Sequence, residues 1–326
     1  MDTILDIAPL SVDKTGLPNT TFKGDVAVIT GGGSNVGLGI SRSLAALGAK
    51  VVIADINPET GLAAEKLINK ETGPDSALFV ETDVSDELSM KAMAEKAFRT
   101  YEKVDILVNN AMDMRLGAQI LKSTVYQMDR QYAISTRGAL IGIQAFVPGM
   151  QRRRHGVVTY LSTAFRYPVG PSNYCAAKSA TTSIMMSLAS ELGPVEQTGV
   201  SVFTFLPAGI GRPRPAPPPG QGPDFDLKFE MPGYGTFIPP EDCGAAMAYA
   251  ISRAKEIHGS GVMINQVFRQ MNWPYPQPET VPQADFERIN EHVLSLMFAY
   301  MGPGFKDPKV PLRSINYSDN IGFPVQ

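Results

Sequence analysis

The sequence predicts an α/β fold, a doubly wound parallel sheet with helices on both faces. Short apolar runs alternate with helical segments of about 12–20 residues, which is the pattern of repeated βαβ units. The apolar runs lack the polar-apolar alternation of a half-exposed strand, so we expect a sheet that is covered on both sides. With 326 residues, 44% hydrophobic and 19% charged, the chain is long enough to build such a core as a single domain.

The predicted elements follow one another regularly over the first two thirds of the chain. Between the first two strands, for example, Val36, Ile40 and Leu44 recur at the spacing of one helix face. Short, right-handed crossovers between parallel strands then produce a doubly wound sheet. Strands are expected at 25–30, 50–54, 77–81, 104–108, 156–161 and 200–206, and helices at 35–48, 58–70, 86–101, 123–150 and 174–192.

The pattern changes after residue 206. The segment at about 208–240 is rich in proline and glycine, yet it also carries aromatic residues, so we expect a lid rather than a disordered segment. A helix is expected again at 240–256 and a strand at 261–267, followed by a tail with one helix near 283–300. The predicted organisation is an N-terminal leader (1–22), one domain (23–268) with its lid insertion, and a C-terminal extension (269–326).

Composition argues against several classes of function. The net charge of −3 offers no basic surface for a phosphate backbone. No apolar run approaches the roughly 20 residues that span a bilayer, and the start of the chain lacks a signal-peptide pattern. Two cysteines fit a reducing cytoplasm, and His155, His258 and His292 lack metal-ligand spacing. We therefore expect a cytoplasmic protein with a small-molecule substrate and no metal, membrane or nucleic-acid partner.

A glycine-rich turn at 30–37 joins the first strand to the first helix. Glycines let the backbone approach a pyrophosphate closely, and the N–H groups of the helix start can bind it. The second strand ends in Asp55, whose carboxylate can accept hydrogen bonds from an adenosine ribose and repels a 2′-phosphate. Since Ser34 offers no positive charge in the turn, NAD is expected and NADP is less favoured. The alternative is a glycine turn that serves packing alone.

Several motifs in order resemble the short-chain dehydrogenase/reductase family, whose fold is Rossmann-like. The resemblance covers about residues 24–267, and the ordered set is more specific than any single motif. The matching motifs are Thr30-Gly31-x-x-x-Asn35-x-Gly37, Asp83-Val84, Asn109-Asn110-Ala111-Met112, Tyr174-Cys175-Ala176-Ala177-Lys178 and Pro207-Ala208-Gly209-Ile210.

The resemblance implies a role for each matched residue. Tyr174 would be the acid/base, and Lys178 would bind the nicotinamide ribose and lower the pKa of the tyrosine. A hydroxyl after the fifth strand would position the substrate oxygen. The residues implied in cofactor binding are Gly31, Ser34, Asn35, Val36, Gly37, Asp55, Ile56, Asp83, Val84, Asn110, Ala111, Met112, Tyr174, Lys178, Pro207, Gly209 and Ile210.

Elementary chemistry supports the Tyr174–Lys178 pair independently. The two residues are four positions apart, so they share one face of a helix. A free tyrosine titrates near pH 10 and is a poor base at neutral pH, whereas a nearby ammonium group favours the phenolate. The pair therefore suits proton transfer. An isolated Tyr-x-x-x-Lys would usually be a surface pair, so its position after the fifth strand is what gives it meaning.

The sequence departs from the family pattern at several positions. Asn35 stands where Gly or Ala is usual, although Asn tolerates a positive φ. Met112 replaces a Gly and can crowd the cofactor, and Ala208 replaces the Gly of a Pro-Gly pair. Ser135 stands where a structural Asn of the active site is expected, with a shorter reach. These changes indicate a modified active site.

The catalytic hydroxyl has two candidates. Strand alignment favours Thr163, which lies 11 residues before Tyr174, whereas the separation of 12 residues favours Ser162. Arg166 follows them on a loop that should border the substrate, where it can meet a carboxylate or lie in solvent.

The aromatic, proline-rich lid favours a small apolar or aromatic substrate. The resemblance thus implies an NAD-dependent oxidoreductase that interconverts a secondary alcohol and a ketone. The alternatives are a non-redox lyase or isomerase on the same scaffold, or a nucleotide-binding regulatory protein. Segment 271–276 can cap the protein's own pocket or a neighbour's, or pack on the sheet edge. In the family the two long helices commonly form a dimer interface, so a homodimer or homotetramer is expected; their small residues are Gly138, Ala139, Ala176, Ala180 and Ser183.

Overall fold

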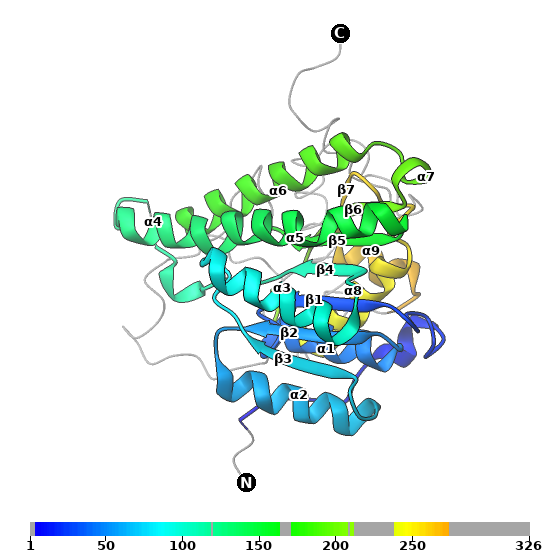
Figure 1. Ribbon diagram of the computed structural model, residues 1–326. Coiled ribbons are helices and arrows are strands. Elements are labelled where there is room, and N and C mark those ends of the chain that lie inside the picture. Colours follow the sequence, from blue (N-terminus) through cyan, green and yellow to red (C-terminus); the bar gives the residue numbers. More distant parts are fainter. Residues whose placement is uncertain (1–3, 119, 164–170, 208, 212–237, 274–326) are drawn as a thin grey trace, which may run out of the picture.

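The computed structural model describes residues 4–118, 120–163, 171–207, 209–211 and 238–273 (Figure 1). These residues form one seven-stranded sheet in the order β3-β2-β1-β4-β5-β6-β7, and all six neighbouring pairs are parallel. Helices flank the sheet on both sides. The order reverses direction between β1 and β4, as a doubly wound sheet requires. The predicted Rossmann-like α/β fold is confirmed.

The element bounds agree closely with the expected ones over the first half. The strands are β1 Val26–Thr30, β2 Lys50–Asp55, β3 Ala77–Glu81, β4 Ile106–Asn109, β5 Gly156–Leu161, β6 Val200–Leu206 and β7 Ser260–Met263. The helices are α1 Asn35–Ala46, α2 Pro58–Thr72, α3 Glu87–Tyr101, α4 Val125–Tyr132, α5 Gly138–Arg153, α6 Ser172–Leu192, α7 Val195–Thr198, α8 Pro240–Ser252 and α9 Ile264–Gln270. Short turns of other helix types are η1 Val12–Thr15, η2 Met114–Leu116 and the π-helical η3 Ala133–Arg137.

The sheet separates two hydrophobic cores, because successive side chains of a strand point to opposite faces. In β1, Ala27 and Ile29 pack with α1, α2, α8 and α9, whereas Val26 and Val28 pack with α3, α5 and α6. Figure 1 shows the second group of helices in front of the sheet. Burial on both faces explains why the strands read as continuous apolar runs.

Helices α1 and α8 pack backbone against backbone. A Cβ atom on Gly39 would lie 2.0 Å from the carbonyl oxygen of Pro240, and one on Gly244 would lie 2.1 Å from the carbonyl oxygen of Gly39. Only glycine fits at either position. This close contact fixes α1, whose first turn borders the cavity described below.

Two expected elements were wrong in their extent. The helix expected at 123–150 is divided into α4 and α5 by the π-helical turn η3. The strand expected at 261–267 ends at Met263, and α9 follows. The side chain of Gln266 accepts a hydrogen bond from the Met263 N–H at 3.0 Å and starts this helix. Ile264, Val267 and Phe268 then follow helical spacing, which a short apolar run conceals.

The described part of the leader, residues 4–22, packs on the domain. Leu5 and Phe22 belong to the core of α1 and α8. The Ser11 hydroxyl donates to Asp242 on α8 at 2.5 Å. At the other end, Trp273 is buried against Phe268, with ring centroids 4.8 Å apart, so the start of segment 271–276 packs on its own domain.

The remaining expected features lie largely outside the described residues. These are the lid at 208–240, apart from 209–211 and 238–240, and the helix near 283–300. No helix among the described residues is long and apolar enough to cross a membrane.

Candidate active site

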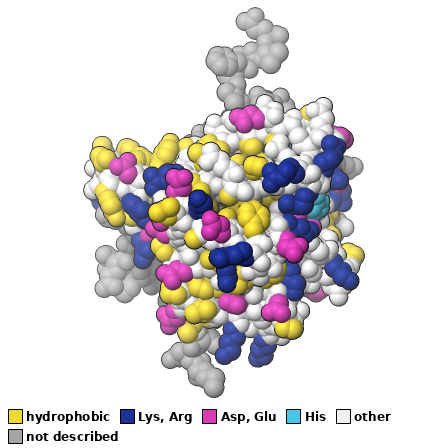
Figure 2. Space-filling model, viewed as in Figure 1, with side chains coloured by type: hydrophobic (Ala, Val, Ile, Leu, Met, Phe, Trp, Pro, Cys, Tyr) yellow, Lys and Arg dark blue, Asp and Glu magenta, His cyan; other side chains and the backbone are white. Residues whose placement is uncertain are grey.

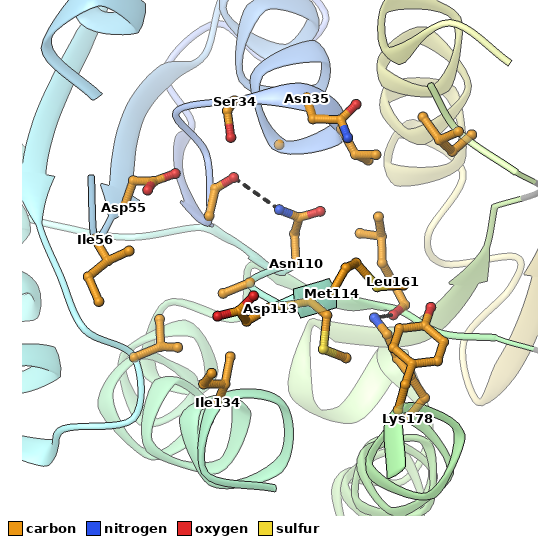
Figure 3. Close-up of a pocket in the computed structure, with 18 of the residues that line it drawn as sticks. Ser34, Asn35, Asp55, Ile56, Asn110, Asp113, Met114, Ile134, Leu161 and Lys178 are labelled. Atoms are coloured by element: carbon orange, nitrogen blue, oxygen red, sulfur yellow. Dashed lines mark hydrogen bonds between the residues drawn. The ribbon is translucent and has the colours of Figure 1, made fainter. Parts of the chain in front are cut away.

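A cavity of about 720 Å³ opens at the carboxyl ends of the central strands (Figure 3). Every residue that the sequence implied in cofactor binding lines it, from the glycine turn through Asp55 and Asn110 to Lys178 and Ile210. Ligands of open α/β sheets bind at this edge, where the strand order reverses. The cavity therefore brings together segments that are up to 179 positions apart, from Gly31 to Ile210.

The glycine turn is shaped by two requirements. Gly31 has a φ of +64°, which favours glycine, and its N–H donates to the carbonyl of Ala54 at 2.7 Å. A Cβ on Gly37 would lie 1.9 Å from the carbonyl oxygen of Gly31. Asn35 adopts a φ of 43°, so the departure from Gly is accommodated by the tolerance of Asn for this region. The start of α1 thus faces the cavity with its backbone N–H groups available.

Asn110 locks the turn after β4 to the turn after β1. Its side-chain amide donates to the carbonyls of Thr30 at 2.9 Å and of Gly31 at 3.1 Å. A dashed line in Figure 3 marks one hydrogen bond of this amide. In return, the Thr30 hydroxyl accepts the N–H groups of Asn110 and Ala111. These hydrogen bonds hold the two turns together.

Asp55 sits at the end of β2 with only 8% of its surface exposed. One carboxylate oxygen accepts the Gly33 N–H at 2.9 Å, and the other accepts the Asn57 N–H at 3.1 Å. Among the described residues, no Lys or Arg forms an ion pair with it. The carboxylate keeps lone pairs for a donor in the cavity, such as a ribose hydroxyl.

Sequence reasoning missed part of the wall. Arg130 of α4 donates to the Ser85 hydroxyl at 3.0 Å and lies 4.0 Å from Asp83, so it supports the turn after β3. No motif signals this arginine, because α4 approaches β3 only in the folded chain. The other lining residues outside the implied set are Ala54, Thr82, Asp113, Met114, Arg115, Ile134, Leu161 and Ser162, of which only Ser162 was a candidate.

Tyr174 and Lys178 meet on one face of α6, as their spacing predicts. The ammonium nitrogen lies 5.6 Å from the centre of the Tyr174 ring and donates to the carbonyl of Leu161. Burial lowers the pKa of Lys178 to about 7. Figure 3 shows this lysine pointing toward the end of β5, opposite Asp55 and Ser34.

Tyr174 does not have the lowered pKa that the resemblance implies. Burial raises the pKa of Tyr174 to about 12, with a smaller contribution from Cys175, while a hydrogen bond with Thr163 opposes the rise. Burial is the largest cause of the shift, and it outweighs any stabilisation of the phenolate by the ammonium group, which lies 5.6 Å from the centre of the ring. The phenol is therefore in its acid form.

The structure separates the two candidate hydroxyls. The Ser162 hydroxyl lies 2.5 Å from that of Thr182 and is buried against α6, although the residue borders the cavity. Thr163 forms a side-chain hydrogen bond with Tyr174. Of the two candidates, Thr163 is therefore the one that contacts Tyr174, the residue that strand alignment favours.

Four other residues singled out in the sequence have different placements. Ser135 does not line the cavity, and its hydroxyl lies 2.7 Å from that of Tyr160 in the core behind it. Met112 does line the cavity, beside Met114, which lies near its centre in Figure 3. Arg166 and Ala208 lie outside the described residues.

Within the part of the chain that the structure describes, one potential metal-ligand group contains a histidine, at the opposite end of the sheet. Ligand atoms of Asp25, Asp105 and His155 lie within 4.8 Å of one another. Asp105 is already neutralised, because it pairs with Lys103 at 2.8 Å and with Arg153 at 3.1 Å. No motif predicts this group, because its members come from distant segments. Its chemistry is that of an ion-pair cluster.

Comparison with known proteins identifies the family. The short chain dehydrogenase profile matches residues 25–214. An uncharacterized oxidoreductase of Thermotoga maritima is 35% identical over 183 residues, which is 56% of this chain and 70% of that protein. Levodione reductase of Leifsonia aquatica is 30% identical over 61% of this chain and 74% of that enzyme. The chain belongs to the short chain dehydrogenase family, and its class is that of an oxidoreductase.

Solved structures share the same core. A metagenomic short-chain oxidoreductase in complex with NADP has 25% identity and a TM-score of 0.60. The 3-ketoacyl-(acyl-carrier-protein) reductase of Brucella melitensis complexed with NADH has 26% identity and a TM-score of 0.62. Each match covers 74% of this chain and 97% of the other. A nicotinamide dinucleotide is therefore the cofactor class, and the two relatives differ in which one they hold.

Proposed function

We propose that this protein is an NAD-dependent oxidoreductase that interconverts a secondary alcohol and a ketone. The observation that carries the proposal is the meeting of Tyr174, Thr163 and Lys178 at the wall of the dinucleotide cavity. A bound nicotinamide would supply or accept the hydride. In this arrangement, Thr163 donates a hydrogen bond at the reacting oxygen, and Tyr174 transfers the proton to or from that oxygen.

The protonation states favour the reductive direction. A tyrosine with a pKa of about 12 is protonated at neutral pH and can give its proton to the alkoxide that forms from a ketone. The oxidative direction needs the phenolate, whose fraction grows with pH. The name of the levodione reductase relative supports the same direction.

Asp55 supports the choice of NAD over NADP. Its carboxylate is fixed by two backbone N–H groups at the place where the second strand ends. A 2′-phosphate at this position would meet a negative charge held within the cavity wall. The relatives include both cofactors, so the support comes from this chain's own residues.

Apolar side chains support a small apolar or aromatic substrate. Met112, Met114 and Ile134 line the cavity together with Leu161. Arg166 is retained as a proposed contact for an anionic group of the substrate. Its test is Arg166→Ala, which should weaken turnover of anionic substrates only; equal constants for all substrates would exclude it.

The cofactor experiment is a calorimetric titration of the purified protein with NADH and with NADPH, followed by a panel of ketones. Tight NADH binding, much weaker NADPH binding and steady NADH consumption with a ketone are expected. Equal binding of both cofactors would overturn the assignment of Asp55. Cofactor binding without turnover of any ketone or alcohol would favour the regulatory alternative, and conversion of substrate without net redox would favour the lyase or isomerase.

We also propose a homodimer or homotetramer in the cytoplasm. Hydrophobic side chains gather over α4 in Figure 2, where Leu121, Val125 and Tyr126 are exposed. Neither cysteine forms a disulfide, as a reducing compartment favours. Gly138 and Ala139 are buried within the chain, so they cannot contribute to the outer face as expected. Light scattering tests the assembly, and a monomer would refute it.

A further inference from the structure

Lys178 rests on a second aromatic ring that belongs to the core. Its ammonium nitrogen lies 4.7 Å from the centre of the Tyr160 ring, closer than the 5.6 Å to Tyr174. Tyr160 is 1% exposed, stands on β5 and does not line the cavity. The ring therefore supports the lysine from behind, on the side away from any bound ligand.

The hydroxyl of Tyr160 fixes the ring relative to α6. It lies 2.7 Å from the hydroxyl of Ser135, which in turn lies 3.3 Å from that of Thr181. Thr181 donates to the carbonyl of Ala177 one helix turn earlier. Thr136 joins the same group, with its hydroxyl 3.1 Å from that of Thr181. Ser135 and Thr136 both belong to the π-helical turn η3, and both of their hydroxyls join this hydrogen-bonded group.

The buried ammonium group needs such support. Lys178 is 4% exposed, and among the described residues no Asp or Glu forms an ion pair with it. Its hydrogen-bond partner, the carbonyl of Leu161, is neutral. Tyr160 from β5 and Tyr174 from α6 are the titratable groups whose rings face it, and both are neutral at pH 7. A cation over a ring face is stabilised most strongly where water is excluded.

We propose that Tyr160 is a positioning residue for Lys178. The face of its ring holds the ammonium group at the cavity wall and favours its charged form over the neutral amine, and the Ser135 hydroxyl holds the ring in place. This inference rests on the proposed function in that Lys178 acts at this wall. Tyr160 itself transfers no proton, because it lies outside the cavity and burial raises its pKa.

The test measures the titration of Lys178 directly. Protein labelled with ¹³C at the lysine ε-carbons is titrated by NMR, and Lys178→Met identifies the signal. Tyr160→Phe keeps the ring, and Tyr160→trifluorophenylalanine keeps its shape while removing the negative potential of its face. We expect the titration midpoint to fall by about one pH unit in the fluorinated variant relative to Tyr160→Phe. Identical midpoints in the two variants would overturn the proposal.

Two further measurements separate the possible failures. Thermal unfolding of both variants checks that they fold alike, since Phe and its fluorinated form have nearly the same volume. Ser135→Ala tests the support of the ring and should lower the midpoint by less than fluorination does; no change would remove Ser135 from the proposal. The titration needs neither substrate nor turnover. A shifted midpoint in a protein without oxidoreductase activity would refute only the proposed function, and turnover with unshifted midpoints would refute only this inference.

Discussion

The two ends of the same three strands carry very different polar groups. Just before β1, β4 and β5 stand Asp25, Asp105 and His155. His155 pairs with Asp25, and Asp105 pairs with Lys103 and Arg153. Just after the same strands come the glycine turn and Asn110, which border an open cavity, and Thr163, whose side chain forms a hydrogen bond with Tyr174 of the cavity wall. Polar side chains at the amino ends satisfy each other, whereas those at the carboxyl ends keep capacity for a ligand.

Two aspartates make the difference concrete. Asp105 is fully buried, and its carboxylate is taken up by Lys103, Arg153 and the Val26 N–H. Asp55 is nearly as buried, yet it accepts only two backbone N–H groups. A buried carboxylate by itself is therefore no sign of a functional site. The partners decide whether it serves the fold or a ligand.

The largest expected effect concerns the site at the carboxyl ends of the strands, where a substitution should lower turnover and leave the fold unchanged. Tyr174→Phe removes the proton donor and should lower turnover of a ketone by about 10²–10⁴-fold. NADH affinity and the unfolding temperature should stay close to those of the unchanged protein. The matched control is Tyr101→Phe on α3, whose hydroxyl donates to the carbonyl of Asp75 far from the cavity. Retained turnover in Tyr174→Phe would mean that another group handles the proton.

The next largest effect concerns the ion pairs at the amino ends of the strands, where a substitution should lower the free energy of unfolding and leave cofactor binding unchanged. Asp105→Asn leaves Lys103 and Arg153 without their carboxylate and should lower the free energy of unfolding by about 2 kcal/mol. The figure lies below the usual one for a buried pair because both cations are about one-third exposed. Urea unfolding measures it, with the exposed Asp75→Asn as control. A loss of NADH binding in the folded variant would contradict the conclusion that the amino ends of the strands serve stability and the carboxyl ends serve ligand binding.

Asp55→Asn should change cofactor binding, in contrast to Asp105→Asn, which should change stability. The loss of a charged acceptor should weaken NADH binding about tenfold, while NADPH binding changes little or improves. Asp105→Asn serves as the binding control, since it removes one carboxylate charge at the other edge of the sheet. Calorimetry measures both cofactors. If the preference for NADH over NADPH is the same in Asp55→Asn as in the unchanged protein, this carboxylate does not select the cofactor.

The smallest effect is a pH dependence of stability at the amino ends. The hydrogen bond to Asp25 raises the pKa of His155, although burial opposes it. Protonated His155 therefore stabilises the fold below its unfolded pKa of about 6.5, and this contribution is lost as the pH rises through the folded pKa. His155→Ala should cost less than about 1 kcal/mol at about pH 5.5, because the ring is more than half exposed, and nearly nothing at about pH 9. In an Asp25→Asn background the difference between the two pH values should vanish.

Much of the fold was predictable because its signals are local. The turn at 30–37 combines a strand end, glycines and a helix start within eight residues, and the apolar runs of β1 and β2 leave no face for water. The break between α4 and α5 was missed because a π-helical turn has no sequence signature of its own. Strand β7 was extended into α9 because a short apolar run fits either element.

The sequence by itself determined which strands end in the glycine turn, Asp55 and Asn110, and it determined the spacing of Tyr174 and Lys178. It also determined the part of the cavity lining that comes from motifs at strand ends. The tertiary structure decided the rest. It turned Ser162 toward Thr182 and Thr163 toward Tyr174, and it placed the Tyr160 ring under Lys178. It also set the pKa values of Tyr174 and Lys178, because burial is the sum of contacts from segments far apart in the chain, and spacing along one helix cannot encode it.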